Sequence, residues 1–210
     1  LYIYNIESKT KLNITNRPGY ELLPQFSPDG SYIIFQSWQN GVREIFFLNL
    51  LEKNEINISR NSLSDDIIPS TNAISPNNQK IVFTSFRDGN MNIYTMNSTG
   101  LNQKKLTSDI ADDYDPMFSH DGQKIVFTSN RSGNKDIYIM DQDGQNLQKL
   151  TTSKYDDWAP KFYPDDTKIV FLSNRDQNWE IYIMHIDGSS QKNITNNNTT
   201  DYSFSILPLK

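Results

Sequence analysis

The sequence predicts an all-β protein, a β-propeller of four-stranded antiparallel blades, and three observations carry this prediction. The run Phe-Ser-Pro-Asp-Gly at residues 26–30 recurs in degraded form at 75–78, 118–122 and 162–166. Aromatic residues recur at equivalent positions of each copy, at Phe35, Phe83, Phe127 and Phe171 and again at Phe46, Tyr94, Tyr138 and Tyr182. Successive copies are 44 residues apart, with one interval of 48. A period in the forties made of short apolar runs is typical of a propeller blade.

Each copy supplies four short strands, as the third copy illustrates. We expect its strands at residues 115–119, 124–129, 136–140 and 147–151. The turns between them contain glycine, which adopts positive φ without a Cβ clash, and Asp or Asn, which bond to their own backbone. The central strands carry continuous apolar runs such as Ile-Val-Phe. Such runs indicate burial on both faces, as expected when each blade stacks between two neighbours.

The repeats predict a single domain over residues 1–210. Four complete blades are expected at 20–60, 61–108, 109–152 and 153–196. Residues 1–19 match the third and fourth strands of a blade, and residues 197–210 match a first strand. We therefore expect both ends of the chain to build a composite closing blade, whose second strand would lie upstream of Leu1. The ring then has five blades, or is part of a larger one.

The interval of 48 residues lies between the first and second complete copies. We place one extra residue in the linker from Ile58 to Asp66 and three more between Pro69 and Ser75. This predicts a bulge or widened loop at residues 70–72. A tolerated surface insertion without a role is the simpler alternative.

Composition excludes several classes of function. The 210 residues include no cysteine, so no disulfide contributes to stability. The net charge is −5 and the basic residues are dispersed, which argues against a nucleic-acid partner. No apolar stretch approaches the ~20 residues that a membrane span needs, and the first residues do not resemble a signal peptide.

Acidic residues occupy one equivalent position before each first strand. They are Glu21, Asp66, Asp113, Asp157 and Asp201, and Asp65, Asp112 and Asp156 lie beside three of them. Since first strands line a propeller's channel, we expect these acids near one mouth, where they repel one another unless a cation or a basic partner neutralises them. The first set predicts a metal site suited to Ca²⁺ or Mg²⁺, and the second set, with Trp158, a partner-binding rim. The alternative, which we favour for the acids, is that each one caps a loop by accepting backbone N–H bonds. For Trp158, core filling between blades is an equal alternative.

Catalytic chemistry has little support in the sequence. The two histidines, His120 and His185, lie in different blades, and no nucleophile elbow, cysteine nucleophile or His-rich cluster is present. Arg131 and Asp136 flank one hairpin, where an exposed pair would contribute under ~1 kcal/mol. We therefore expect a binding protein rather than an enzyme.

The repeat resembles the WD-like propeller repeat (PD40) of the TolB family. Residues 24–30 match its opening, and 125–129, 136–144 and 150–151 match the remainder. The resemblance covers nearly the whole chain. It implies a periplasmic or secreted, non-catalytic propeller, expected to be a monomer, whose partner is a peptidoglycan-associated lipoprotein bound at the acidic channel mouth. It also implies six blades, so that the chain would be a fragment of a six-bladed ring.

The same repeat is found in other settings, which leaves two alternatives open. One is an accessory propeller that gates a prolyl-oligopeptidase-like hydrolase. The other is a metal-dependent carbohydrate-binding or lyase propeller.

Overall fold

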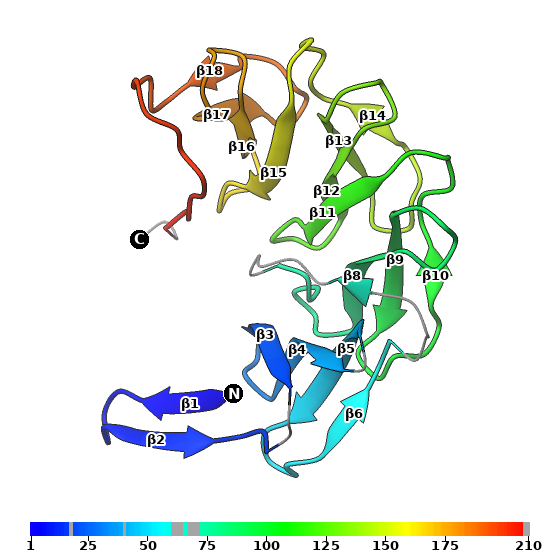
Figure 1. Ribbon diagram of the computed structural model, residues 1–210, viewed down its shortest axis with the longest axis vertical. Helices are drawn as coiled ribbons and strands as arrows, with labels where there is room; N and C mark the ends of the chain where they lie inside the picture. Colours follow the sequence, from blue (N-terminus) through cyan, green and yellow to red (C-terminus); the bar gives the residue numbers. More distant parts are fainter. Residues whose placement is uncertain (17–18, 40, 60–64, 67–71, 208–210) are drawn as a thin grey trace.

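The blades and an N-terminal hairpin follow one another around an arc, with both termini at its open side (Figure 1). The computed structural model of the chain describes residues 1–16, 19–39, 41–59, 65–66 and 72–207. All regular elements in these ranges are β-strands, so the predicted all-β class is confirmed. No helix in this part of the chain has the length and apolar character that a membrane crossing requires.

Four antiparallel sheets of four strands form blades 1 to 4. Blade 1 contains β3 (Tyr20–Phe26), β4 (Tyr32–Gln39), β5 (Val42–Asn49) and β6 (Glu55–Asn57). Blade 2 contains β7 (Asp65–Asp66), β8 (Lys80–Ser85), β9 (Asn92–Asn97) and β10 (Lys104–Lys105). Blade 3 contains β11 (Asp113–Phe118), β12 (Lys124–Ser129), β13 (Asp136–Asp141) and β14 (Gln148–Lys149). Blade 4 contains β15 (Asp157–Phe162), β16 (Lys168–Ser173), β17 (Glu180–His185) and β18 (Lys192–Asn193).

The hydrophobic core lies between the blades. One cluster joins Ile34, Ile45 and Ile58 of blade 1 to Phe83 and Met96 of blade 2, all almost fully buried. Similar clusters join blade 2 to blade 3 and blade 3 to blade 4. Each fully buried aliphatic or aromatic side chain contributes roughly 1.5–3 kcal/mol, so the stacking of blades supplies most of the stability. This explains the continuous apolar runs of the central strands.

The first strands share a bulge. In blades 1, 3 and 4 the register shifts between Leu22 and Gln25, between Tyr114 and Met117, and between Trp158 and Lys161. Inside each bulge one non-glycine residue adopts positive φ, at Leu23, Asp115 and Ala159. A proline follows each of them, and proline has no N–H to donate to the ladder. The bulge therefore recurs as a built feature of the inner strand.

The predicted closing blade is only partly formed by the described residues. β1 (Tyr2–Asn5) and β2 (Thr10–Asn13) pair with each other alone, and the hairpin packs through Leu1, Ile3 and Ile14 on blade 1. Residues 202–207 have no assigned strand. The joining of the two ends in one blade, and the number of blades in the ring, therefore stay predictions.

The structure corrects the register of blade 2. Asp65, rather than Asp66, lies opposite Ser85, as Asp113 lies opposite Ser129 in blade 3. Asp65 is also seven residues past Ile58, so the preceding linker contains no extra residue. The longer interval therefore arises after Asp65. Most of the bulge predicted at 70–72 lies outside the described residues, except Asn72, whose carbonyl accepts a 2.9 Å hydrogen bond from the Phe118 N–H.

Candidate functional site

One end of the propeller carries the residues that the sequence singled out. The hairpins between second and third strands and the linkers between blades meet there, and we call this end the linker face. The opposite end carries the turns between first and second strands and those between third and fourth strands, and we call it the turn face. The first strands begin at the linker face, so Asp113 and Asp157 start β11 and β15 there.

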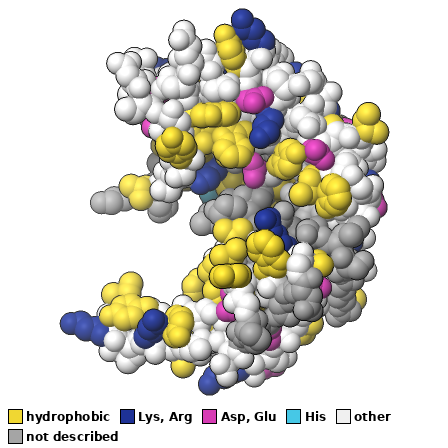
Figure 2. All heavy atoms as spheres, viewed as in Figure 1, with side chains coloured by type: hydrophobic (Ala, Val, Ile, Leu, Met, Phe, Trp, Pro, Cys, Tyr) yellow, Lys and Arg dark blue, Asp and Glu magenta, His cyan; other side chains and the backbone are white. Residues whose placement is uncertain are grey.

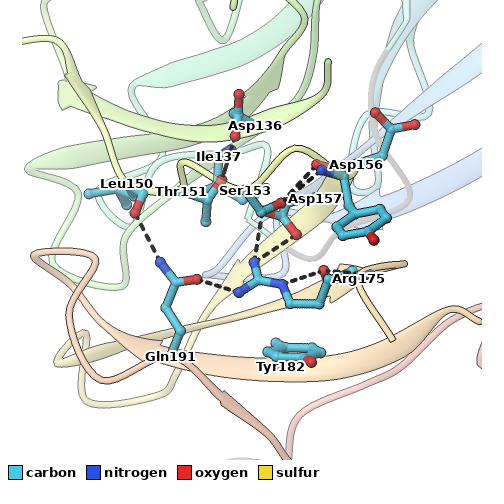
Figure 3. A network of polar contacts seen from close by, with 12 residues as sticks. Asp136, Ile137, Leu150, Thr151, Ser153, Asp156, Asp157, Arg175, Tyr182 and Gln191 are labelled. Atoms are coloured by element: carbon cyan, nitrogen blue, oxygen red, sulfur yellow. Dashed lines mark hydrogen bonds and ion pairs between the residues drawn. The ribbon is translucent and has the colours of Figure 1, made fainter. Parts of the chain in front are cut away.

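In blade 4 the carboxylate of Asp157 is fully buried and paired with an arginine (Figure 3). The Arg175 Nη2 donates to both carboxylate oxygens at 2.9 Å, and its Nε donates to the Ser173 Oγ at 2.8 Å. The guanidinium lies 4.6 Å from the ring centroid of Tyr182. Charge-assisted pairing and stacking on an aromatic ring are both suited to arginine. Asp157 is thus neutralised inside its own blade.

The same arrangement is repeated in the neighbouring blades. In blade 3 the Arg131 Nη2 donates to both oxygens of buried Asp113, at 2.8 and 2.9 Å, and a second nitrogen pairs with Asp109 at 2.9 Å. Burial raises the pKa of Asp113 above its ordinary value, although the hydrogen bonds from Ser129 and Arg131 oppose the shift. In blade 2 Arg87 bonds the Ser85 Oγ at 2.7 Å and lies over Tyr94.

Asp136 and Arg131, which flank one hairpin, are not partners. Asp136 is buried and pairs instead with Lys149 at 2.8 Å. Burial raises the pKa of Asp136 as well. The expected pairing of Arg131 with Asp136 is therefore wrong. Arg131 pairs instead with Asp113, the buried carboxylate of the first strand.

Blade 1 departs from this pattern in a way that the sequence shows. Gln39 stands where blades 2, 3 and 4 have arginine. The hydroxyl of the preceding serine, Ser37, is fully buried and has no hydrogen-bond partner in the described part of the chain. Glu21 instead accepts a hydrogen bond from the Thr15 hydroxyl.

The second set of acids links neighbouring blades. Asp112 accepts a 2.8 Å hydrogen bond from the backbone N–H of Met91 in blade 2. Asp156 accepts one of 2.9 Å from the N–H of Lys135 in blade 3. Both side chains therefore cap a hairpin by accepting a backbone N–H bond, as the sequence suggested. The capped hairpin belongs to the preceding blade and not to the blade of the acid itself.

Asparagines complete this linkage in a repeated manner. Asn90, Asn134 and Asn178 each donate from Nδ2 to carbonyl groups of the linker that follows their blade. Gln191 adds another tie, because its Nε2 donates to the Leu150 carbonyl of blade 3 while its Oε1 accepts from Arg175 (Figure 3). The asparagine contacts fix the blades at the linker face.

The predicted metal ligands do not gather as a group in the described residues. No three His, Cys, Asp or Glu side chains come together there in an arrangement suited to a metal ion. Asp113 and Asp157 are occupied by arginine, and Asp201 lies after the last blade. The side chains of Asp65 and Asp66 are not described. Cation binding at these positions stays a prediction.

Aromatic side chains and a lysine lie side by side at the linker face. The Lys135 Nζ lies 4.9 Å from the ring centroid of Trp158 and 5.7 Å from that of Tyr114. Trp158 and Trp179 have ring centroids 5.9 Å apart. Trp158, Trp179, Tyr114 and Lys135 are all partly exposed, and we call them the aromatic–lysine surface. In the view of Figure 2, hydrophobic side chains gather at the inner rim of the arc beside Lys or Arg side chains.

The indole N–H of Trp158 differs from the other polar groups of this surface. Its Nε1 is buried and has no acceptor in the described part of the chain. A buried indole N–H usually has a partner. Of the residues predicted for partner binding, Asp112 and Asp156 are engaged in hydrogen bonds between blades, whereas Trp158 is a partly exposed aromatic residue. The sequence did not associate Lys135, Tyr114 and Trp179 with it, although Lys135 and Trp179 occupy equivalent positions in successive repeats.

Comparisons with known proteins bear on the family and on the fold. The family model described as the TolB beta propeller domain matches residues 64–158. A curated TolB homolog from Chlorobium chlorochromatii is 25% identical over 125 residues, which cover 58% of this chain and 26% of the relative. A second, from Chlorobaculum tepidum, is 26% identical over 107 residues, 51% of this chain and 24% of the relative. The matched segments thus span about a quarter of the relatives' length.

Solved structures show the same fold. The putative TolB from Agrobacterium tumefaciens is 24% identical, with 96% of this chain and 71% of that one covered and a TM-score of 0.74. An oligogalacturonate lyase in complex with manganese is 12% identical, with coverages of 92% and 58% and a TM-score of 0.72. A puromycin-hydrolyzing peptidase of Mycobacterium tuberculosis is 13% identical, with coverages of 87% and 30% and a TM-score of 0.70.

Proposed function

We propose that the chain, whose repeats resemble those of the TolB β-propeller, is a non-catalytic scaffold that binds a protein partner at the channel mouth of its linker face. The observation that carries the proposal is the partly exposed aromatic–lysine surface, with the unpartnered Trp158 Nε1 at its centre. Asp112, Asp113, Asp156 and Asp157 of the same face are engaged inside the protein. The contact residues that we propose are therefore aromatic and basic.

The chemistry of this surface suits a protein interface. Tryptophan and tyrosine dominate the binding energy of many interfaces, because they bury a large area and offer a polar tip. Trp158 and Trp179 are held in place from both sides, since the backbone of Trp179 accepts a 2.7 Å hydrogen bond from Asp201 and Lys135 lies over Trp158. Preorganised side chains lose little entropy on binding.

The partner that we propose is a peptidoglycan-associated lipoprotein, and the setting is the bacterial periplasm. Both follow from the resemblance of the repeats and from the name of the relatives. Lyases and peptidases share the fold at 10–15% identity, and a likeness of that order carries no activity to this chain. A gating propeller of a hydrolase and a metal-dependent lyase propeller remain the competing hypotheses.

The test is a binding titration with the purified soluble domain of the peptidoglycan-associated lipoprotein encoded in the same genome. We expect saturable binding by calorimetry, weakened at least tenfold in the double variant Trp158→Ala/Trp179→Ala. The matched control is Tyr4→Ala, an exposed aromatic on the N-terminal hairpin, which should bind like the wild type. Absence of binding, or equal affinity in all three proteins, would overturn the proposal.

A further inference from the structure

One side-chain position at the linker face varies from blade to blade, although its backbone is used in the same way. It directly precedes the third strand and is occupied by Met91, Lys135 and Trp179 in blades 2, 3 and 4. The N–H of Met91 donates to Asp112 at 2.8 Å, and the N–H of Lys135 donates to Asp156 at 2.9 Å. The carbonyl groups of all three residues accept a hydrogen bond from the chain that follows their blade. These bonds do not depend on the side chain, so the joining of the blades does not require the ammonium group of Lys135.

The Lys135 ammonium group lies beside the rings of two neighbouring blades. Its Nζ is 5.7 Å from the ring centroid of Tyr114 in blade 3 and 4.9 Å from that of Trp158 in blade 4. The faces of aromatic rings attract a cation at such distances, but they carry no net charge that would neutralise it. All three side chains are partly exposed, so the charge can be reached from solvent.

The acids around Lys135 are used by other donors. Asp156 accepts the backbone N–H of Lys135 itself. Asp112 accepts the N–H of Met91, and burial together with a hydrogen bond to Asp112 raises the pKa of Tyr114 to about 12. The first-strand acids of blades 3 and 4 are paired with arginine. In the described part of the chain Lys135 forms no ion pair, and its charge is therefore available to an anion from outside.

We propose that Lys135 recognises a carboxylate side chain, from Asp or Glu, of the protein partner. This inference rests on the proposed function and names the chemical group that the partner contributes to the aromatic–lysine surface. An acidic side chain matches both features of the place, because its carboxylate complements the ammonium group and its CH₂ groups can contact the rings of Tyr114 and Trp158. The partner that fits is one with an acidic residue inside an apolar contact patch.

The chain itself supplies the variant for the test. Met91 occupies the same position in blade 2, so Lys135→Met keeps the backbone contacts and an apolar side chain while it removes the charge. In calorimetric titrations with the soluble lipoprotein domain, we expect Lys135→Met to weaken binding by about tenfold and Lys135→Glu to weaken it further. Lys135→Arg, which keeps the charge, should bind like the wild type. The matched control is Lys154→Met, which removes the same charge from an exposed lysine of the neighbouring linker and should change the affinity by less than about twofold.

The salt dependence of the same titrations separates a charge contact from an apolar one. Dissolved salt screens the attraction between charges at a surface. The difference in affinity between the wild type and Lys135→Met should therefore narrow as the sodium chloride concentration is raised. A lysine that only covers the Trp158 ring would give the two proteins equal affinities at every salt concentration.

The outcomes distinguish this inference from the function on which it rests. Equal binding of the lipoprotein domain by the wild type and Lys135→Met would overturn the role of Lys135 and leave the proposed docking intact. Equal losses in Lys135→Met and Lys154→Met would also overturn it, because the attraction would then be a general effect of charge. Absence of binding by the wild type would overturn the proposed function and this inference with it.

Discussion

Arg175 donates two hydrogen bonds of 2.9 Å to the buried carboxylate of Asp157, eighteen positions earlier in the chain. This pair joins the first strand of blade 4 to the turn after its second strand, and with the equivalent pair of blade 3 it explains why an acid begins the first strand of these two blades. The carboxylate of such an acid is used in an ion pair within its own blade.

Removal of the arginine should therefore be costly. Arg175→Gln leaves the Asp157 carboxylate buried and uncompensated, and we expect the free energy of unfolding to fall by about 3 kcal/mol in urea titrations. The double variant Arg175→Gln/Asp157→Asn should recover much of this loss. Lys124→Gln, which breaks the exposed pair with Asp141, is the control and should change stability by under ~1 kcal/mol. A loss no larger for Arg175→Gln than for the control would show that the pair is dispensable.

Close packing of successive blades makes a second prediction, at Gly188. A Cβ there would lie 2.6 Å from the Leu150 carbonyl oxygen of the preceding blade, and φ is +84°. Gly133 also has positive φ, at +100°, but has open space around its Cα. Both alanine variants should be destabilised by backbone strain, by about 1–3 kcal/mol. Gly188→Ala should lose at least 1 kcal/mol more than Gly133→Ala in the same urea titration, and equal losses would argue against the contact.

The turn face supports a third prediction, based on a matched pair of residues. Asp166 and Asn78 occupy the same turn position, both with positive φ. The Asp166 carboxylate accepts 2.9 Å hydrogen bonds from the N–H groups of His120 and Asp121 in the preceding blade. Asn78 faces a turn in which proline, Pro28, replaces His120, and its buried Oδ1 has no partner in the described residues.

Glycine suits this backbone conformation at both positions. Asp166→Gly should therefore lose about 1–2 kcal/mol of stability, because two interblade hydrogen bonds disappear. Asn78→Gly should be neutral or stabilising. The same direction of change in the two melting midpoints would contradict this account of the turn face.

Alkaline pH should weaken the fold through buried tyrosines. Burial, with a hydrogen bond to Asp176, raises the pKa of Tyr182 to about 12 from 10.0. Because the folded protein favours the protonated phenol, this contribution is complete below pH 10 and is lost as the pH rises to 12. Tyr182→Phe should show a smaller loss of stability over that interval in pH-dependent urea titrations. An unchanged pH profile would mean that Tyr182 does not titrate with unfolding.

Calcium provides a fifth test. Since Asp113 and Asp157 are paired with arginine, we expect the melting midpoint to stay the same with and without millimolar Ca²⁺. A rise in the midpoint that Asp201→Asn abolishes would support the cation site predicted from the sequence.

The fold was predictable because the information is repeated. Each copy contains similar turn residues and apolar runs, so a strand that is ambiguous in one copy can be assigned by alignment with the others. The register of blade 2 was the exception, because adjacent Asp65 and Asp66 offer two alignments, and backbone pairing with Ser85 decides between them.

The candidate site was less predictable, because its partners are distant in sequence. The recurrence of Ser-x-Arg, with Gln39 as its one departure in the four blades, was the signal for the buried pairs. The equivalent positions of the acids in the repeats predicted an acidic mouth, but position alone does not reveal which acids are neutralised inside the protein. The neighbourhood of Lys135 and Trp158 depends on how two blades meet, which no local pattern encodes.

The most direct test of the docking proposal is hydrogen–deuterium exchange of the chain with and without the soluble lipoprotein domain. We predict added protection at the linker face, in segments 110–114, 130–135, 155–158 and 175–179, with the turn-face segments 120–123, 142–145 and 164–167 unchanged. Protection confined to the turn face, or no protection at saturating lipoprotein, would contradict the account.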